Sequence, residues 1–395
     1  GALVMSASAV VHPPGPQPRF VVDPYLFGAT ALLALLGLVM VTSASISVAD
    51  RELTDPFYHL RAQARGFGAG LFATVFCLAV PTRLWERTGF LALPLALVLL
   101  VLVLVPGIGH TVNGSTRWIR LPGLNLQPSE PARILLLVYL SSYLVRHADA
   151  LRASFGGFLR PMLFIALAAS LLLAEPDFGA ATVLIGTAMG VLFIAGARLR
   201  DFVLLFGVAG GLLAALALSA TYRVERLMAF LDPWADPFDT GFQLTQSLIA
   251  IGRGEWLGVG LGGSVQKLFY LPFPHTDFVF AVLAEELGLV GAAATIGLFV
   301  VVVWRAFAIA RTALEGQRFF QGYLAYGLGL WVALQAFINI GVNMGVLPTK
   351  GLTLPLLSYG GSSLVVSMAA LALLLRIHHE NHAPTRRRRA PRSVR

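Results

Sequence analysis

The chain has little charge and almost no cysteine. Charged residues are 12% of its 395 residues, about half of the roughly 25% found in an ordinary soluble domain. The single cysteine, Cys77, excludes an internal disulfide, and its apolar surroundings predict a buried thiol. The sequence has no His/Cys cluster with zinc spacing, no P-loop and no dinucleotide fingerprint. It therefore gives no sign of ATP use or of a redox cofactor.

Apolar residues dominate instead, at 57% of the chain. No soluble fold hides that much apolar surface, and runs long enough to cross about 30 Å of hydrocarbon recur throughout. We predict an all-α polytopic membrane protein with one transmembrane domain over 23–377, a flexible tail over 1–22 and a basic tail over 378–395. Hydropathy predicts ten transmembrane helices, at about 24–44, 63–80, 89–106, 131–146, 161–174, 178–197, 201–221, 277–304, 319–342 and 353–376.

Arginines decide the orientation. Most of them lie in the loops and tails of one side, which the positive-inside rule makes cytoplasmic. Both termini are then cytoplasmic, and the long loops 45–62, 107–130 and 222–276 are extracellular, the last between helices seven and eight. The run Arg386–Arg389 suits contact with anionic membrane lipids, with a protein-docking motif as the alternative, and no nucleic-acid binding is expected.

The loop 222–276 is too long for a simple connector, which suggests a function. Its apolar part, around 244–251, could form an amphipathic or re-entrant segment. Glycines between 252 and 263 either cradle a phosphate with their backbone amides or make ordinary turns. Lys267 adds a cation near the end of this loop, and Arg117 adds one in the loop 107–130.

Acidic residues near the ends of apolar runs are the main candidates for chemistry. Asp277 opens the predicted eighth helix, where a carboxylate can be either an N-terminal cap or a catalytic group. Glu285 and Glu286 follow inside that helix, and a buried acid must be paired or protonated, so a helix–helix tether is favoured for Glu286.

Two further acidic motifs leave alternatives open. Glu130 and Arg133, three residues apart, could be an ion pair lining a cavity or a pair that extends to the membrane interface. Glu175 and Asp177 lie in a tight turn, where solvated side chains are the default and a metal or substrate role is the alternative.

The motifs 127–130 (QPSE), 175–179 (EPDFG), 275–278 (HTDF) with 285–288 (EELG), and 347–363 together resemble the SEDS family (shape, elongation, division and sporulation), in order and over nearly the whole chain. Residues 143–146 and the basic C-terminal tail resemble the division branch more than the elongation branch. One departure is Arg133, where the family usually has lysine, so the contact geometry there differs.

The resemblance implies a ten-helix peptidoglycan glycosyltransferase that polymerises lipid II at the outer face of the bacterial cytoplasmic (inner) membrane, at the division septum. In the family the aspartate matching Asp277 is essential, which suits a general base. The division branch implies a class B penicillin-binding protein (an FtsI-type transpeptidase) as partner, with the FtsQ, FtsL and FtsB regulators.

Cations are expected at the pyrophosphate that leaves the donor sugar, with or without a divalent metal such as Mg or Mn. The predicted substrate and pyrophosphate set is Lys350, Arg133, Glu130, His275, Arg117, Lys267 and Ser358, with Glu285 and Glu286 as supporting buried acids. Rival hypotheses are a lipid II flippase, an elongation-type polymerase and a scaffold without catalysis.

Overall fold

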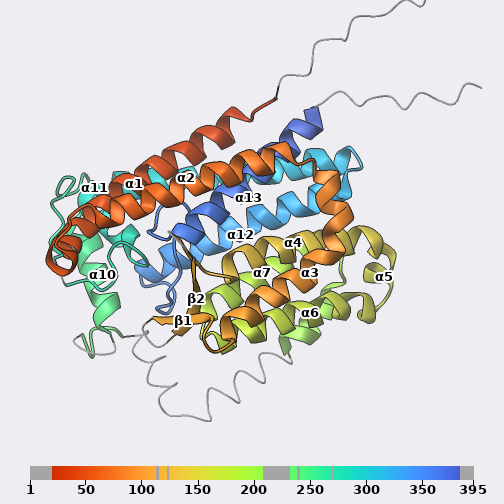
Figure 1. Cartoon of the computed structure of the whole chain (residues 1–395), viewed down its shortest axis with the longest axis horizontal. Helices are drawn as coiled ribbons and strands as arrows, with labels where there is room; N and C mark the ends of the chain where they lie inside the picture. Colours follow the sequence, from red (N-terminus) through yellow and green to blue (C-terminus); the bar gives the residue numbers. More distant parts are fainter. Residues whose placement is uncertain are drawn as a thin grey trace, which may run out of the picture.

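The computed structural model describes residues 20–112, 115–121, 124–207, 232–237, 241–268 and 270–382, and these form an elongated helical bundle (Figure 1). Seven of the described helices are long and apolar enough to cross a membrane. They are α1 (Pro24–Leu53), α2 (Tyr58–Ala79), α3 (Thr82–Leu104), α6 (Phe155–Ala174), α11 (Val279–Glu315), α12 (Phe319–Asn343) and α13 (Gly361–His382). The remaining helices are α4 (Ser129–Arg146), α5 (Ala148–Ala153), α7 (Phe178–Ile194) and α10 (Phe242–Arg253).

The helices confirm a multi-pass membrane protein. Nine of the ten predicted spans overlap a described helix; of the tenth, 201–221, residues 201–207 are helical and the rest lie outside the described residues. The count of ten thus stays a prediction. α4 is as long as a span, but Glu130, Arg133 and Arg146 make it more polar than the seven.

Several predicted boundaries were wrong. The loop 45–62 is mostly helical, α3 starts at Thr82, α11 runs to Glu315, and α13 starts only at Gly361. Hydropathy marks the part of a helix inside the hydrocarbon, but backbone hydrogen bonding continues the helix into polar residues beyond it.

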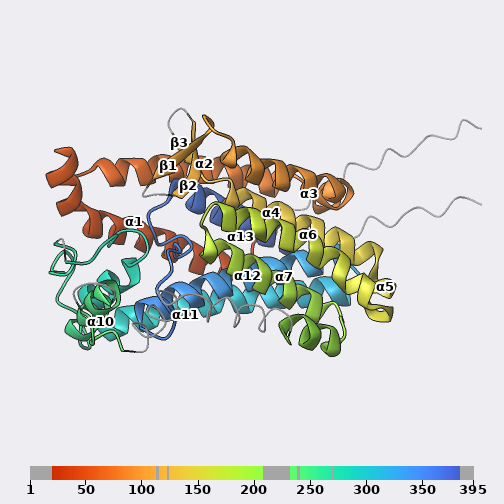
Figure 2. The same cartoon turned by 90° about the horizontal axis from the view of Figure 1, so that it is seen from below.

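The predicted loop 107–130 contains a small antiparallel sheet, which the sequence analysis did not predict. It consists of β1 (Gly109–Val112), β2 (Ser115–Leu121) and β3 (Leu124–Leu126), in the order β1-β2-β3. The sheet and α10 lie at one end of the bundle (Figures 1 and 2), which we call the hairpin end. Phe20 and His379, near the two ends of the described chain, stack at 4.3 Å at the opposite, terminal end.

α13 forms the centre of the bundle. It is the most buried of the seven candidate spans and packs against α2, α11, α12 and α4 (Figures 1 and 2). Between α12 and α13 the chain is non-helical from 344 to 360. The residues of this segment therefore lie at the hairpin end of the bundle.

α11 is interrupted near its start. Gly288 has φ 68° and ψ −169°, a conformation that only glycine adopts easily. The loop after α10 fills the interruption: the amides of Val259 and Gly260 donate to the carbonyls of Glu285 and Glu286 at 3.0 and 3.1 Å. A Cβ at Gly258 would lie 2.2 Å from the Glu286 carbonyl oxygen. The glycines at this contact therefore allow the loop to pack closely against α11. Close packing explains these glycines, so they do not need to bind a phosphate.

Candidate active site

A cavity of about 700 Å³ opens at the hairpin end. It lies among α2, α4, α7, the sheet, the turn before α11 and the segment before α13. Its lining residues are Tyr58, Ala62, Arg65, His110, Ser115, Arg117, Trp118, Asn125, Gln127, Glu130, Arg133, Asp177, Ala180, Phe273, Thr276, Asp277, Gly351, Leu352, Thr353, Tyr359, Gly360, Gly361 and Ser363. Four predicted site residues, Asp277, Glu130, Arg133 and Arg117, are thus brought together from distant parts of the chain.

Asp277 lies in the turn before α11 and is half-buried at the cavity wall. The helix is capped at Phe278 without any side-chain hydrogen bond, so the capping alternative for Asp277 is not what the structure shows. Burial raises the pKa of Asp277 to about 6, with Arg117 acting in the opposite direction and Asp177 in the same one. A carboxylate of this kind is ionised at neutral pH and more basic than usual, as a general base requires.

The residues around Asp277 hold its backbone and crowd its side chain. Asn339 and Asn343 of α12 donate side-chain amides to its carbonyl at 2.9 and 3.0 Å. A Cβ at Gly351 would lie 3.1 Å from the Asp277 carboxylate oxygen Oδ2. The glycine therefore allows the segment after Lys350 to run directly beside the carboxylate.

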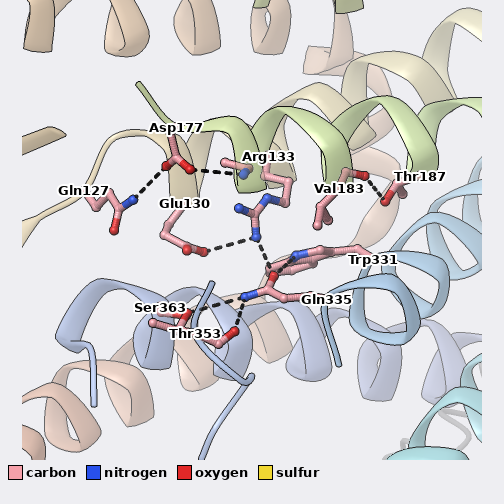
Figure 3. A network of polar contacts seen from close by, with 11 residues as sticks. Gln127, Glu130, Arg133, Asp177, Val183, Thr187, Trp331, Gln335, Thr353 and Ser363 are labelled. Atoms are coloured by element: carbon pink, nitrogen blue, oxygen red, sulfur yellow. Dashed lines mark hydrogen bonds and ion pairs between the residues drawn. The ribbon is translucent and has the colours of Figure 1, made fainter. Parts of the chain in front are cut away.

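Arg133 is held by a network that joins α4 to α12 (Figure 3). Its Nη1 donates to Gln335 Oε1 at 2.7 Å and lies 3.5 Å from Glu130 Oε2, and its guanidinium is 5.1 Å from the Trp331 ring centroid. The side chains of Arg133 and Glu130 are 3% and 5% exposed, so the interface-extending alternative is wrong. They form a buried ion pair at the cavity wall.

Gln335 extends this network to the segment before α13. Its Nε2 donates to the Thr353 carbonyl at 2.8 Å, and the Thr353 and Ser363 hydroxyls are 2.9 Å apart (Figure 3). The position of Arg133 is therefore coupled to the segment that passes Asp277.

The turn acids between α6 and α7 are buried, so the solvated default was wrong. Asp177 caps α7 by accepting from the Ala180 amide at 3.1 Å, and it accepts from Gln127 Nε2 at 3.2 Å (Figure 3). Glu175 is fully buried, and burial with the nearby Asp177 charge raises its pKa to about 8, against an opposing effect of Arg117. Arg117 donates to the main-chain carbonyls of Glu175 (3.0 Å) and Pro176. This turn is thus part of the cavity wall.

Three predicted residues lie beside the cavity without lining it. Lys350 is exposed, with Nζ 5.1 Å from the centroid of the Phe178 ring. Ser358 is buried, donates to the Thr276 carbonyl at 2.6 Å and accepts from the Leu354 amide at 2.7 Å, which fixes the turn around Asp277. His275 packs against the His59 and Tyr359 rings, and burial lowers its pKa to about 4, so it is neutral at pH 7.

Lys267, Glu285 and Glu286 are not at the cavity but at the interruption of α11. Lys267 Nζ donates to Glu286 Oε1 at 2.6 Å and to Ser43 Oγ of α1 at 3.0 Å, which confirms the tether expected for Glu286. Glu285 accepts from Arg253 (3.0 Å) and from the Ser264 hydroxyl (2.5 Å). The geometry therefore gives Lys267 a structural partner in place of a pyrophosphate.

Other residues in or behind the cavity wall were missed from the sequence. Arg65 lies in the predicted span 63–80, where an ionisable residue is itself a signal. Gln335, Asn339 and Asn343 are spaced four residues apart along α12 and form a polar stripe on one face of the helix. Hydropathy is averaged over a window of residues, so it does not reveal such a stripe. In the described part of the chain, no group of three or more His, Cys, Asp or Glu residues is arranged to hold a metal ion.

Known proteins resemble this chain in sequence and in fold. Residues 24–383 match the FtsW/RodA/SpoVE family, described as "Cell cycle protein". A "Probable peptidoglycan glycosyltransferase FtsW" of Thioalkalivibrio sulfidiphilus is 59% identical over 352 residues, which are 89% of this chain and 88% of the relative. Its counterpart in Nitrosococcus halophilus is 54% identical over 375 residues, 95% and 96% of the two chains.

Solved structures agree with the fold. A chain from a peptidoglycan synthase complex that coordinates polymerization and crosslinking superposes with a TM-score of 0.74 at 29% identity, covering 92% of this chain and 99% of that one. The rod shape determining protein RodA of Thermus thermophilus superposes with a TM-score of 0.66 at 29% identity, covering 93% and 99%.

Proposed function

This chain belongs to the FtsW/RodA/SpoVE family of cell cycle proteins, and from that membership we propose that it is a peptidoglycan glycosyltransferase that polymerises lipid II during septal cell-wall synthesis. The observation that carries the proposal is Asp277, a carboxylate with a raised pKa at the wall of a large cavity. Among the described residues, no hydrogen bond to its side chain is found. Its carboxylate is therefore available to a substrate.

The reaction is a single displacement at the anomeric carbon of the donor sugar. The acceptor hydroxyl oxygen forms the new glycosidic bond, the bond from the anomeric carbon to the lipid diphosphate breaks, and Asp277 takes the hydroxyl proton. The diphosphate leaves with its bonding electron pair and needs cations, not a proton, to stabilise it. One displacement inverts the anomeric carbon.

The other predicted residues have different roles, which follow from their positions in or beside the cavity wall. Arg133 and Glu130 are too buried and too well paired to move, so they shape the wall and fix a positive charge there. Arg117 contributes charge from the sheet, and Lys350 lies beside the entrance. A divalent cation at the diphosphate remains a prediction, and a loss of polymerisation with EDTA that Mg²⁺ or Mn²⁺ restores would support it.

The hairpin end faces outside in this proposal. Arg146, Arg318 and Arg376, near the ends of α4, α12 and α13, lie at the terminal end, and so does Arg305, which pairs with Asp23 before α1. The positive-inside rule makes this end cytoplasmic. Lipid II would enter from the outer leaflet, with its hydrocarbon chain in the membrane and its sugars in the cavity.

A class B penicillin-binding protein is the proposed partner, with FtsQ, FtsL and FtsB as regulators. Support comes from the likeness to a peptidoglycan synthase complex and from the FtsW relatives. A flippase is less well supported, because Glu285 and Glu286, the acids that ion coupling would use, are held in ion pairs.

The test is polymerisation of purified lipid II by the purified full chain in nanodiscs, with and without the partner transpeptidase. Glycan strands are resolved by gel electrophoresis. We expect strands with the partner present. Absence of strands in both conditions, with lipid II moving between leaflets instead, would favour the flippase.

A further inference from the structure

Arg65 of α2 is a cavity-lining cation that the predicted set did not contain. With Tyr58 and Ala62 it occupies positions i, i+4 and i+7 of the helix, so the three share one face, and all three line the cavity. Its side chain is exposed. α2 therefore contributes a guanidinium to the cavity lining in addition to those of Arg133 and Arg117.

The other arginines that line the cavity are already engaged. Arg133 is buried between Glu130, Gln335 and the Trp331 ring. Arg117 donates to two main-chain carbonyls. Lys267 is paired with Glu286 away from the cavity. For Arg65, no hydrogen bond or ion pair to any described residue is found, although it lies near enough to Tyr359 to oppose the burial that raises the pKa of that phenol.

The surface of α2 beyond Arg65 is apolar. Phe72 and Phe76, seven and eleven residues further along, lie on the same face and are 77% and 52% exposed. They are within the candidate membrane span, about two and three turns beyond Arg65 in the direction away from the start of α2. Exposed aromatic side chains in a span face hydrocarbon.

A lipid-linked sugar has three parts in a fixed order: a hydrocarbon chain, a diphosphate and the sugar. The face of α2 offers matching surfaces in that order, with Phe76 and Phe72 first, then Arg65, then the cavity that leads to Asp277. Guanidinium is the side chain best suited to the paired oxygens of a diphosphate, because it donates from a rigid planar fork.

We propose that Arg65 binds the diphosphate of the lipid-linked substrate, with the hydrocarbon chain lying along Phe72 and Phe76. This inference rests on the proposed function and adds the place where the charged part of the substrate is held. It also explains how the cavity attracts an anion although Glu130, Asp177 and Asp277 line it.

The experiment compares Arg65→Gln and Arg65→Lys with the matched control Arg61→Gln. Arg61 lies one turn earlier on α2, is paired with Asp55 and does not line the cavity. Each full-length variant is assayed in nanodiscs with lipid II, with polyprenyl diphosphate and polyprenyl monophosphate as competitors. Direct binding of polyprenyl diphosphate is measured in parallel.

We expect Arg65→Gln to raise the KM for lipid II by about tenfold to a hundredfold, as for the loss of a charge-assisted hydrogen bond, and to change kcat less. The preference for diphosphate over monophosphate should disappear. Arg65→Lys should be intermediate, because it keeps the charge but not the fork, and Arg61→Gln should match the wild type.

An unchanged KM and an unchanged diphosphate preference in Arg65→Gln would overturn the inference. If Arg65→Gln does not purify as a folded protein, the competitor preference of Arg65→Lys decides in the same way. If the wild type makes no glycan, the proposed function fails, whereas binding of polyprenyl diphosphate to wild type and variants still decides the role of Arg65.

Discussion

Asn339 on α12 donates its side-chain amide to the main-chain carbonyl of Asp277 at 2.9 Å. The same nitrogen lies 2.5 Å from the Leu352 carbonyl oxygen, and Asn339 is 1% exposed. One buried amide therefore joins the turn that carries Asp277 to the segment that passes beside its carboxylate. Since catalysis depends on where the base lies to a fraction of an ångström, we treat Asn339 as a positioning residue.

Asn339→Leu should lower kcat by about tenfold or more with little change in the KM for lipid II, because misplacing the base affects the chemical step more than binding. Two buried carbonyls also lose a donor, which costs about 1–3 kcal/mol of stability. The matched control is Arg305→Leu, which breaks a buried pair with Asp23 at the terminal end. If both variants lose stability and both keep kcat, Asn339 does not position the base.

The rate of polymerisation should depend on pH through Asp277. Because burial raises its pKa to about 6, kcat/KM should rise with pH, with a midpoint near that value, and then level off as the carboxylate ionises. Arg117→Gln should move the midpoint upward, since Arg117 lowers this pKa. A pH profile with its midpoint near 4 in both proteins would contradict the assignment.

Arg133→Lys should keep much of the activity and Arg133→Ala should lose it. The ammonium retains the charge and can donate to Gln335, whereas alanine leaves Glu130 and Gln335 buried without their partner. Removing one member of a buried pair costs about 3–5 kcal/mol, so Arg133→Ala should also melt earlier. Equal loss of activity in the two variants, both folded, would show that guanidinium geometry is needed and charge alone is not enough.

The orientation can be tested by cysteine labelling in a Cys77→Ala background. Arg198→Cys and Arg311→Cys should react with an impermeant thiol reagent only after the membrane is opened, whereas Lys350→Cys and Arg120→Cys should react from outside. All four positions are exposed or half-exposed. Gly254 is unsuitable, because a Cβ there would lie 1.9 Å from the Ala284 carbonyl oxygen. Labelling of position 311 in intact cells would invert the topology.

The fold could be predicted from the sequence to the extent that a membrane dictates it. Nine of the predicted spans coincide with described helices, because hydrocarbon requires every spanning backbone to be helical. The sheet β1–β3 and the interruption at Gly288 escaped prediction for a physical reason. Both are backbone conformations stabilised by hydrogen bonds to segments that are distant in sequence or of low hydropathy, such as Val259 to Glu285.

The site residues that lie in short sequence motifs were predicted. The roles that depend on which distant residue a side chain pairs with were missed. Asp277, Glu130 and Arg133 stand out as ionisable residues at the ends of apolar runs. By contrast, Lys267 looked like a free cation, and only its distance of 2.6 Å to Glu286 shows otherwise. Arg65 belongs to no motif, and its place in the lining of the cavity is visible only in the structure.

Asp277→Asn should abolish polymerisation while the protein remains folded. The amide keeps the shape of the side chain but cannot accept the proton, and no hydrogen bond to a described residue is lost, because α11 is capped at Phe278 without its help. Substrate binding should persist, since the diphosphate is held elsewhere.

Stability separates this role from a structural one. The pKa of Asp277 rises from 3.8 to about 6 on folding, so its contribution to stability is fully present below the lower value and is lost as pH rises through the higher one. At pH 8 the ionised carboxylate is thus a cost, and Asp277→Asn should melt at the same temperature as the wild type or higher. Strands made at near wild-type rate by the variant would remove Asp277 as the base, and a melting temperature several degrees lower would assign it a structural role instead.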